Sequence, residues 1–278
     1  MKKITEFKLT PLERTPQLVQ HFVSLEGEGG TIGRSALYIR TGECSLRCNF
    51  CDTAYSVEGD GKFDIVDMTT QKYVDLLRNT YSRAQRHNIT NLSITGGEPL
   101  LNINYIRELI LKTREAFPKI NQIIFETNGT MLSKQENCFK LIEQVGSLHP
   151  DISFMLSISP KLSGKISYSS LLEDDEVLDV YKKVMINYKN ILDAHFDIQL
   201  KFVHSDILSK WNETLIDFVL DMEDAIVKNQ ILIMPFTPQD PLGKDKEEWE
   251  KSKDSAAHYA MHNFFRYSPR VHVDRKLD

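Results

Sequence analysis

Short apolar stretches alternate along this chain with longer stretches in which apolar residues recur at helical spacing. The short stretches are rich in β-branched residues and end in turn residues, which predicts strands at residues 35–40, 92–95, 122–126, 153–158, 197–203 and 231–235. The longer stretches predict helices at residues 70–86, 103–117, 133–145, 177–187 and 211–229. Strands that alternate with amphipathic helices indicate β-α units and a parallel sheet.

The predicted fold class is α/β, with an open, partial (β/α)6 barrel of the TIM type. Six strands are too few for the closed barrel, which needs eight. The 278 residues, 41% hydrophobic and 26% charged, suit one large globular domain. We expect a single domain over residues 1–278, with its core at about 20–240 and a C-terminal extension at 241–278. The charged stretch at 243–254 is expected to be a solvated loop and helix start.

The charge balance bears on the partners of the protein. Thirty-four basic and 39 acidic residues give a net charge of −5, so no broad positive surface is expected to hold a nucleic acid. A small-molecule substrate is the better expectation. No apolar run reaches the length of a membrane span, and the first residues lack the apolar stretch of a signal peptide, which predicts a cytoplasmic protein without a membrane partner.

Three of the four cysteines, Cys44, Cys48 and Cys51, fall within eight residues, directly after a predicted strand. Cytoplasmic chains rarely form structural disulfides, so this crowding indicates a metal site. Soft thiolate ligands suit iron–sulfur clusters and zinc. Three thiolates on one loop can hold three irons of a four-iron cluster and leave the fourth iron without a protein ligand. The fourth cysteine, Cys138, is expected to be a buried bystander.

A structural zinc site is the alternative interpretation of these cysteines. Such a site normally has four ligands, and no second cysteine pair follows in the sequence. Cys138 or a histidine would have to complete it. His258 and His262 stand four residues apart, a spacing that can bind a metal, but no third ligand lies near them in the sequence.

Polar or glycine-rich residues follow three predicted strands: residues 95–99 (TGGEP), 126–129 (ETNG) and 159–161 (SPK). Each segment taken alone is also what an ordinary turn looks like. The carboxyl ends of parallel strands, however, meet at one edge of a sheet, where such folds bind ligands. Glycines there allow the backbone to approach a ligand closely.

The cysteine loop resembles the signature of the radical S-adenosylmethionine (SAM) superfamily, and the TGGEP segment resembles a motif of the same superfamily. The resemblance implies a modified radical SAM core and a [4Fe–4S] cluster whose open iron chelates SAM. An electron from the cluster would then cleave SAM to a 5′-deoxyadenosyl radical. By the same resemblance, SAM would be bound by Phe50, Asp52, Gly97, Glu98, Glu126, Ser159, Pro160 and Lys161.

Residues 22–29 (FVSLEGEG), with Gly33, Arg34, residues 38–40 and the Asp52-Thr53 pair, resemble the 7-carboxy-7-deazaguanine synthases. That resemblance implies a carbon–nitrogen lyase that converts 6-carboxy-5,6,7,8-tetrahydropterin to 7-carboxy-7-deazaguanine with loss of ammonia. The product would serve queuosine and 7-deazapurine biosynthesis, and hence tRNA modification, without direct contact with nucleic acid. A homodimer and a flavodoxin-type or ferredoxin-type electron donor are further implications.

The resemblance also implies roles for particular side chains. Thr53 would bind Mg²⁺, and His272 in the tail would approach the site. The pterin would be contacted by Leu25, Glu26, Gly27, Glu28, Arg40 and Thr95. Glu28 could read the pterin edge, and Arg40 could pair with its carboxylate in a forked geometry.

One position departs from the resembled family, which usually has glutamine where this chain has Glu26. An ionised carboxylate only accepts hydrogen bonds, whereas an amide also donates, so an altered substrate stays open. Taken alone, Glu26 and Glu28 are also typical of exposed acids in a turn, and Arg40 of a strand-end charge. A radical SAM activase that makes a glycyl radical on a partner protein and a zinc-dependent binding module are the competing functions.

Overall fold

The computed structural model describes residues 17–48, 50–58, 66–133, 145–147, 149–161, 174–187, 196–205, 209–221 and 230–277. One nine-stranded sheet runs through it in the order β3-β1-β2-β4-β5-β6-β7-β8-β9. The strands are β1 Gln17–Leu25, β2 Ser35–Thr41, β3 Val66–Asp67, β4 Asn91–Gly96, β5 Gln122–Thr127, β6 Ser153–Ile158, β7 Phe196–His204, β8 Ile231–Pro235 and β9 Arg266–Tyr267. Cys138 and most of the helix predicted at 133–145 lie outside the described residues.

The six predicted strands are β2 and β4 to β8, and each pairs in parallel with the next. The order of the strands is linear, so the sheet is open, and the predicted partial barrel is confirmed. Three strands were not predicted. β1 pairs antiparallel with β2, β3 with β1, and the two-residue β9 extends the sheet in parallel beyond β8. The stacked rings of Phe22 and Tyr38, 4.9 Å apart, lie across the β1–β2 pair.

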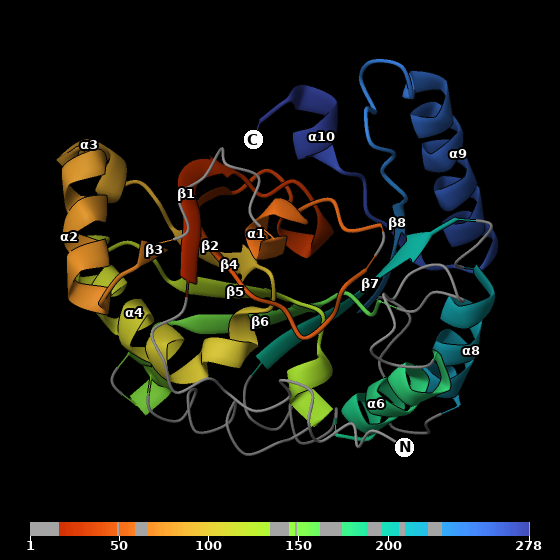
Figure 1. Cartoon of the computed structure of the whole chain (residues 1–278), viewed down its shortest axis with the longest axis horizontal. Helices are drawn as coiled ribbons and strands as arrows, with labels where there is room; N and C mark the ends of the chain where they lie inside the picture. The colour runs from red at the N-terminus through yellow and green to blue at the C-terminus, as the bar shows by residue number, and fades with distance from the viewer. Residues whose placement is uncertain are drawn as a thin grey trace.

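Helices are ranged around the outside of the curved sheet, with α2 and α4 on one side and α6, α8 and α9 on the other (Figure 1). The α-helices are α1 Tyr55–Glu58, α2 Thr70–Thr80, α3 Arg83–Arg86, α4 Ile103–Ala116, α6 Asp174–Ile186, α8 Ser209–Leu220, α9 Lys246–His262 and α10 Val271–Arg275. Short 3-10 helices are η2 Gly29–Thr31, η3 Pro99–Asn102 and η4 Thr130–Ser133. In the described part of the chain, no helix combines the length and the apolar character that a membrane crossing requires.

The helix predicted at 70–86 is wrong in its continuity, because the structure divides it into α2 and α3. Tyr81 has an extended backbone, and Ser82 begins a new helix with a capping box. The hydroxyl of Ser82 accepts from the backbone N–H of Gln85, and the Gln85 side chain accepts from the backbone N–H of Ser82. This reciprocal cap satisfies donors that a continuous helix would pair internally.

The charged stretch at 243–254 is the largely exposed loop and helix start that the sequence predicts, with one exception. It does contain a helix start, since α9 begins at Lys246, but the Trp249 side chain is completely buried. Its indole N–H donates to the carboxylate of Asp274 at 2.8 Å. One apolar residue among many charges therefore joins the two C-terminal helices, α9 and α10, to each other.

Alternation along the strands separates an apolar face from a polar one. Leu37 and Ile39 of β2, with Leu92 and Ile94 of β4, belong to the buried core. The opposite face carries polar side chains near the carboxyl ends of the strands, where barrels usually have packed apolar layers. By strand register these residues are Arg40, Thr95, Glu126, Ser157 and Gln199, with Lys201 two positions further along β7. This inner polar face is the natural position for a ligand.

Candidate active site

The cysteine loop, residues 42–51, connects β2 to the segment before α1. Cys44 and Cys48 are half-buried and Cys51 is exposed, and all three are free thiols. The Arg47 guanidinium donates to the carbonyl oxygens of Cys44 and Leu46, both at 2.9 Å. The backbone N–H of Cys51 donates to the Cys48 carbonyl at 3.1 Å. These local bonds hold the backbone of the loop in tight turns.

Burial raises the pKa of Cys44 to about 11 and that of Cys48 to about 12. A charge on Cys51 raises both pKa values further, so an ionised Cys51 opposes the ionisation of the other two thiols. Thiolates in this loop therefore need a cationic partner, and three soft sulfur donors fit an iron–sulfur cluster. Among the described residues, no three His, Cys, Asp or Glu side chains already converge on one point as metal ligands. Nothing in that part of the chain completes a four-ligand zinc site.

The two glycines of the TGGEP segment dock β4 against the cysteine loop. The backbone N–H of Gly97 donates to the Thr41 carbonyl at 2.9 Å, and Gly96 has a φ of 127°. A Cβ atom on Gly96 would lie 2.0 Å from the Thr41 oxygen, and one on Gly97 would lie 1.7 Å from the Glu43 oxygen. Only residues without a side chain fit at these two positions. The motif therefore positions the cysteine loop, and its contact with SAM stays a prediction.

Glu98 follows these glycines and is completely buried. Its carboxylate accepts hydrogen bonds from the Thr127 hydroxyl at 2.7 Å and from the backbone N–H groups of Asn128 and Leu100 at 2.8 and 3.0 Å. Burial raises its pKa to about 7 despite these bonds. In this arrangement Glu98 ties the ends of β4 and β5 together, and its contact with SAM stays a prediction.

Asn128 links the end of β5 to the cysteine loop. Its side-chain amide donates to the Ser45 hydroxyl at 3.1 Å and lies 3.6 Å from the Cys44 sulfur. Its carbonyl accepts from the Tyr181 hydroxyl of α6 at 2.8 Å. The Tyr181 oxygen in turn accepts from the backbone N–H of Lys161. A continuous set of hydrogen bonds thus joins three strand ends around the cysteines.

Ser159, Pro160 and Lys161 follow β6, as predicted for a SAM contact. Ser159 and Pro160 are buried, and the Lys161 ammonium donates to the Ser159 hydroxyl at 3.0 Å. The Lys161 charge also lowers the pKa of the Cys48 thiol, against the larger effect of burial. A cation therefore stands beside the cysteine loop, where an anionic ligand group would be favoured.

The segment after the cysteines approaches the C-terminal tail, as Figure 1 shows for α1 and α10. The Asp52 carboxylate accepts from the Arg270 guanidinium at 2.6 Å. The Thr53 hydroxyl lies 3.8 Å from the Cys51 sulfur, and Phe50 is half-buried. The predicted SAM and Mg²⁺ contacts of these residues remain predictions. Arg270 pairs with both Asp52 and Glu28, and we call the region where these three residues meet the mouth of the barrel.

The glycine-rich loop after β1 covers the inner polar face. Glu26 is buried, and its Oε2 accepts from the Tyr38 hydroxyl at 2.7 Å. Its Oε1 is also buried and has no hydrogen-bond partner among the described residues. Burial raises the pKa of Glu26 to about 7, and the nearby carboxylate of Glu126 contributes in the same direction. The alternative of an exposed turn acid therefore does not hold for Glu26.

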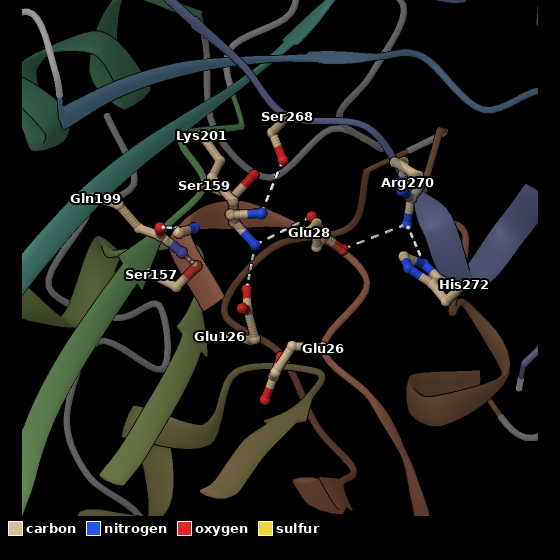
Figure 2. Close-up of polar contacts among 12 residues, drawn as sticks. Glu26, Glu28, Glu126, Ser157, Ser159, Gln199, Lys201, Ser268, Arg270 and His272 are labelled. Carbon is tan, nitrogen blue, oxygen red and sulfur yellow. Dashed lines mark hydrogen bonds and ion pairs between the residues drawn. The ribbon is translucent and has the colours of Figure 1, made fainter. Parts of the chain in front are cut away.

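Glu28 is part of a buried ion cluster (Figure 2). Its carboxylate lies 3.1 Å from the Lys201 ammonium and 3.8 Å from the Arg270 guanidinium. Lys201 also pairs with Glu126 at 2.5 Å. Burial alone would raise the pKa of Glu28, but Lys201 and Arg270 hold it well below the ordinary value. An ionised Glu28 at the barrel mouth is therefore the stable form.

Two further contacts fix the glycine-rich loop. The backbone N–H of Gly30 donates to the Gln199 side chain, and that of Gly29 to the Ser268 hydroxyl, both at 2.8 Å. His272 of α10 lies directly against Gly27, where an added Cβ would be 2.0 Å from its ring. The tail therefore packs against the loop, and a role of His272 in the site stays a prediction.

Arg40, Thr95 and Leu25 complete the predicted substrate contacts. The Arg40 guanidinium lies 5.9 Å from the Phe22 ring centroid and 5.7 Å from that of Tyr55. Its Nε is buried without a hydrogen-bond partner in the part of the chain that is described. Thr95 neighbours Arg40 on β4, whereas the Leu25 side chain is exposed at the end of β1. A ligand acceptor would satisfy the unused Arg40 donor.

Sequence reasoning missed Lys201, Gln199 and Arg270. A lysine in the middle of an apolar strand was a usable signal, because lysine is almost never buried unless it is paired. Arg270 gave no such signal, since its partners are distant in the sequence. His258 and His262 are exposed on α9, and the metal site that their spacing allows is not formed by the described residues.

A comparison with protein families matches residues 38–195 to the Radical SAM superfamily. The match runs from β2 to the residue before β7 and covers more than half of the 278 residues. The chain belongs to the radical SAM superfamily. Membership implies a [4Fe–4S] cluster and SAM, and the three cysteines supply the donors that such a cluster needs. The zinc-dependent binding module is thereby set aside.

This radical SAM protein is similar to curated 7-carboxy-7-deazaguanine synthases. The one from Clostridium acetobutylicum is 32% identical over 115 residues, which are 41% of this chain and 47% of that protein. The one from Halobacterium salinarum is 27% identical over 261 residues, 91% of this chain and 87% of that protein. The chain thus spans about half of the first relative and most of the second.

The fold has a counterpart among solved structures. The crystal structure of QueE from Escherichia coli aligns with 98% of this chain and 99% of its own, at a TM-score of 0.51. The sequence identity is 17%, so this likeness concerns the fold alone. It supports the open barrel as the scaffold on which this radical SAM site is built.

Proposed function

We propose that this radical SAM protein is a 7-carboxy-7-deazaguanine synthase that converts 6-carboxy-5,6,7,8-tetrahydropterin to 7-carboxy-7-deazaguanine with loss of ammonia. The observation that carries the proposal is the glycine-rich loop. It brings Glu26 and Glu28 over the inner polar face that bears Arg40, beside the cysteine loop. Relatives of that name, matched along most of the chain, support it.

The polar groups at the mouth suit a pterin. Arg40 has a buried donor without a partner in the described residues, and it would pair with the carboxylate of the substrate. Glu26 offers an oxygen without a partner there, and near neutral pH part of the population would be protonated and able to donate. Glu28 stays ionised and would accept from ring N–H groups.

When bound, the [4Fe–4S] cluster and SAM supply the radical chemistry, which removes a hydrogen atom from C6 of the pterin before the ring contracts. The chain's own part is to hold and orient the reactants. Cys44, Cys48 and Cys51 would hold the cluster. Ser159, Pro160 and Lys161 would meet SAM from β6, and Glu126 from β5, while Gly97 lets the backbone come close.

The closed mouth supports a small substrate over a partner protein. Arg270 in the tail reaches Asp52, Glu28 and the Thr237 hydroxyl, so the tail holds three separate segments together at the mouth. A glycyl-radical activase would need the mouth to receive a loop of another protein. A homodimer, a single domain, a cytoplasmic location and a flavodoxin-type or ferredoxin-type electron donor are parts of the same proposal.

Anaerobic reconstitution with iron, sulfide, SAM, reductant and Mg²⁺, followed by mass spectrometry of the pterin reaction, tests the function. Formation of 7-carboxy-7-deazaguanine is the expected result. Cleavage of SAM without that product would contradict the substrate and direct attention to Glu26, where the resembled family usually has glutamine.

The most specific part of the proposal is that Thr53 binds Mg²⁺. A hydroxyl together with substrate oxygens and waters is a suitable ligand set for that hard ion. Thr53→Ala should leave SAM cleavage intact and weaken the dependence of turnover on Mg²⁺, as measured by a Mg²⁺ titration. Thr80→Ala, which removes a hydroxyl bonded to the Leu76 carbonyl at the end of α2, is the matched control. An unchanged Mg²⁺ response in Thr53→Ala would remove Thr53 from the metal site.

A further inference from the structure

Lys201 is the most deeply buried cation of the ion cluster. It lies on β7, and its side chain points to the inner face, where it reaches Glu28 of the glycine-rich loop and Glu126 of β5 (Figure 2). These partners precede it by 173 and 75 residues. One ammonium group therefore joins three elements that come together only in the folded barrel.

Exposure distinguishes the lysine from its partners. The Lys201 side chain is 2% exposed, whereas those of Glu28 and Glu126 are 19% and 18% exposed. The two carboxylates are thus partly accessible to solvent, whereas the ammonium is covered. A ligand that approaches from solvent would meet the acids before the lysine.

Stability alone is a poor reason for such an arrangement. Removing an ammonium and two carboxylates from water costs about as much as their attraction returns, and apolar replacements of buried ion pairs are often neutral or stabilising. A fixed orientation of the two acids relative to each other, in contrast, requires a charged group that pairs with both, as Lys201 does. Gln199, two residues earlier on the same strand, braces the same loop through Gly30 and reaches the Ser157 hydroxyl.

We propose that Lys201 is a positioning residue, which holds Glu28 toward the pterin and Glu126 toward SAM and so couples the two binding sites. The pterin half of this inference rests on the proposed function, and the SAM half rests on the contact with SAM that is proposed for Glu126. The charge of Lys201 also helps to keep Glu28 ionised, since that carboxylate is mostly removed from water and this desolvation alone would favour its protonated form.

Several charged groups besides Lys201 face Glu28 or the acids next to it. They are Arg270 and His272 of the tail, Glu26 of the same loop, Glu126 of β5 and Asp52 after the cysteines. Arg270 and His272 lower the pKa of Glu28 in the same direction as Lys201. Loss of Lys201 should therefore raise the pKa of Glu28, but by less than the loss of all the neighbouring cations would.

The test compares Lys201→Met and Lys201→Arg with the wild type in the reconstituted protein. Lys201→Met should keep its iron content, raise KM for the pterin and the Kd for SAM on the order of tenfold, and change kcat less. The acidic limb of kcat/KM should move to higher pH, because Glu28 then protonates more readily. Lys201→Arg, which keeps the charge, should restore part of each loss.

Lys112→Met is the matched control, since it removes the same charge from an ion pair with Glu108 on the outer helix α4. If Lys201→Met resembles this control in KM, SAM affinity and pH profile, the inference is overturned. If Lys201→Met fails to fold, Lys201→Gln, which keeps an N–H donor, is judged by the same three measurements.

Equilibrium binding of SAM separates failure of this inference from failure of the proposed function. A wild-type protein that binds SAM but does not convert the pterin would contradict the proposed substrate alone. The inference is then decided by SAM affinity in Lys201→Met, where a tenfold loss supports it and an unchanged Kd contradicts it.

Discussion

The cysteine loop and the mouth of the barrel are held in place by different kinds of contact. Around the cysteines, the backbone of Gly97 meets that of Thr41, and Glu98 caps neighbouring backbone N–H groups. At the mouth, long side chains such as Lys201 and Arg270 pair with carboxylates of distant elements. The cysteine loop thus depends on glycines that allow close backbone contact, and the mouth depends on pairs of opposite charges.

This difference predicts how each region responds to substitution. Where two backbone segments are in direct contact, no free volume is left between them. One methyl group added to a glycine there must displace the whole loop. Ion pairs are softer, because a cluster with two cations keeps part of its function when one is lost. We therefore expect nearly complete losses of activity from changes on the cluster side, and graded changes of affinity and pH dependence at the mouth.

The largest effect is expected from Cys48→Ala. Two remaining thiolates hold a four-iron cluster poorly, so both the cluster and turnover should be lost. Iron and sulfide analysis with the absorption spectrum of the reconstituted protein measures this. Cys138→Ala, at the cysteine that the sequence predicts to be a bystander, should keep its full iron content. An intact four-iron cluster in Cys48→Ala would contradict the assignment of Cys48 as a cluster ligand.

Gly97→Ala tests whether backbone contact alone can disable the cluster side. Its Cβ would lie 1.7 Å from the Glu43 carbonyl oxygen, so the cysteine loop must move. We expect a loss of turnover of about 100-fold, the size associated with a displacement of roughly 1 Å at a reacting centre. Gly146→Ala, where an added Cβ meets nothing within 4 Å, is the control. Equal activity in both variants would show that the two loops do not need to touch.

The cluster side is also the region that the sequence predicts best. Three cysteines on one loop and the TGGEP segment are local sequence patterns. Such patterns can be recognised without knowledge of the tertiary structure. The parallel strands could be predicted for the same reason, since each one shows its own apolar run. What the pattern did not reveal at Gly96 and Gly97 is their main contact, which is with the cysteine loop.

The mouth of the barrel was predicted less completely because its contacts are long-range. Glu26 and Glu28 were identified by resemblance, but Lys201 and Arg270, which are 173 and 218 residues from their partners Glu28 and Asp52, were not. No local pattern relates residues so far apart. β1 was missed because only its antiparallel pairing with β2 makes its partly exposed sequence a strand.

Arg270→Ala should give a graded effect, in contrast to the cluster-side changes. It removes the contacts of the tail with Asp52, Glu28 and Thr237, so the mouth opens while the cysteines stay in place. We expect KM for the pterin to rise on the order of tenfold with unchanged iron content. Arg275→Ala removes the same charge from an exposed position of α10 and is the control. A loss of iron in Arg270→Ala would show that the tail is needed for cluster binding, which would contradict its assignment to the mouth.

The smallest effect on turnover is expected from Glu26→Gln, and its signature is pH dependence. The folded chain holds the Glu26 proton up to a pKa of about 7, against an ordinary value of 4.5, so the wild type loses stability as the pH rises between these values. Glutamine cannot ionise, and its oxygen can still accept from Tyr38. The free energy of unfolding of the variant should therefore exceed that of the wild type by up to about 3 kcal/mol at pH 8, measured by urea unfolding of the cluster-free protein.

Glu28→Gln should instead be less stable than the wild type at neutral pH, because Lys201 and Arg270 stabilise the ionised form of Glu28. This difference in the free energy of unfolding should shrink as the pH falls. If both variants were equally stable at every pH, the two acids would not differ in charge, and the mouth would not be organised by ion pairs.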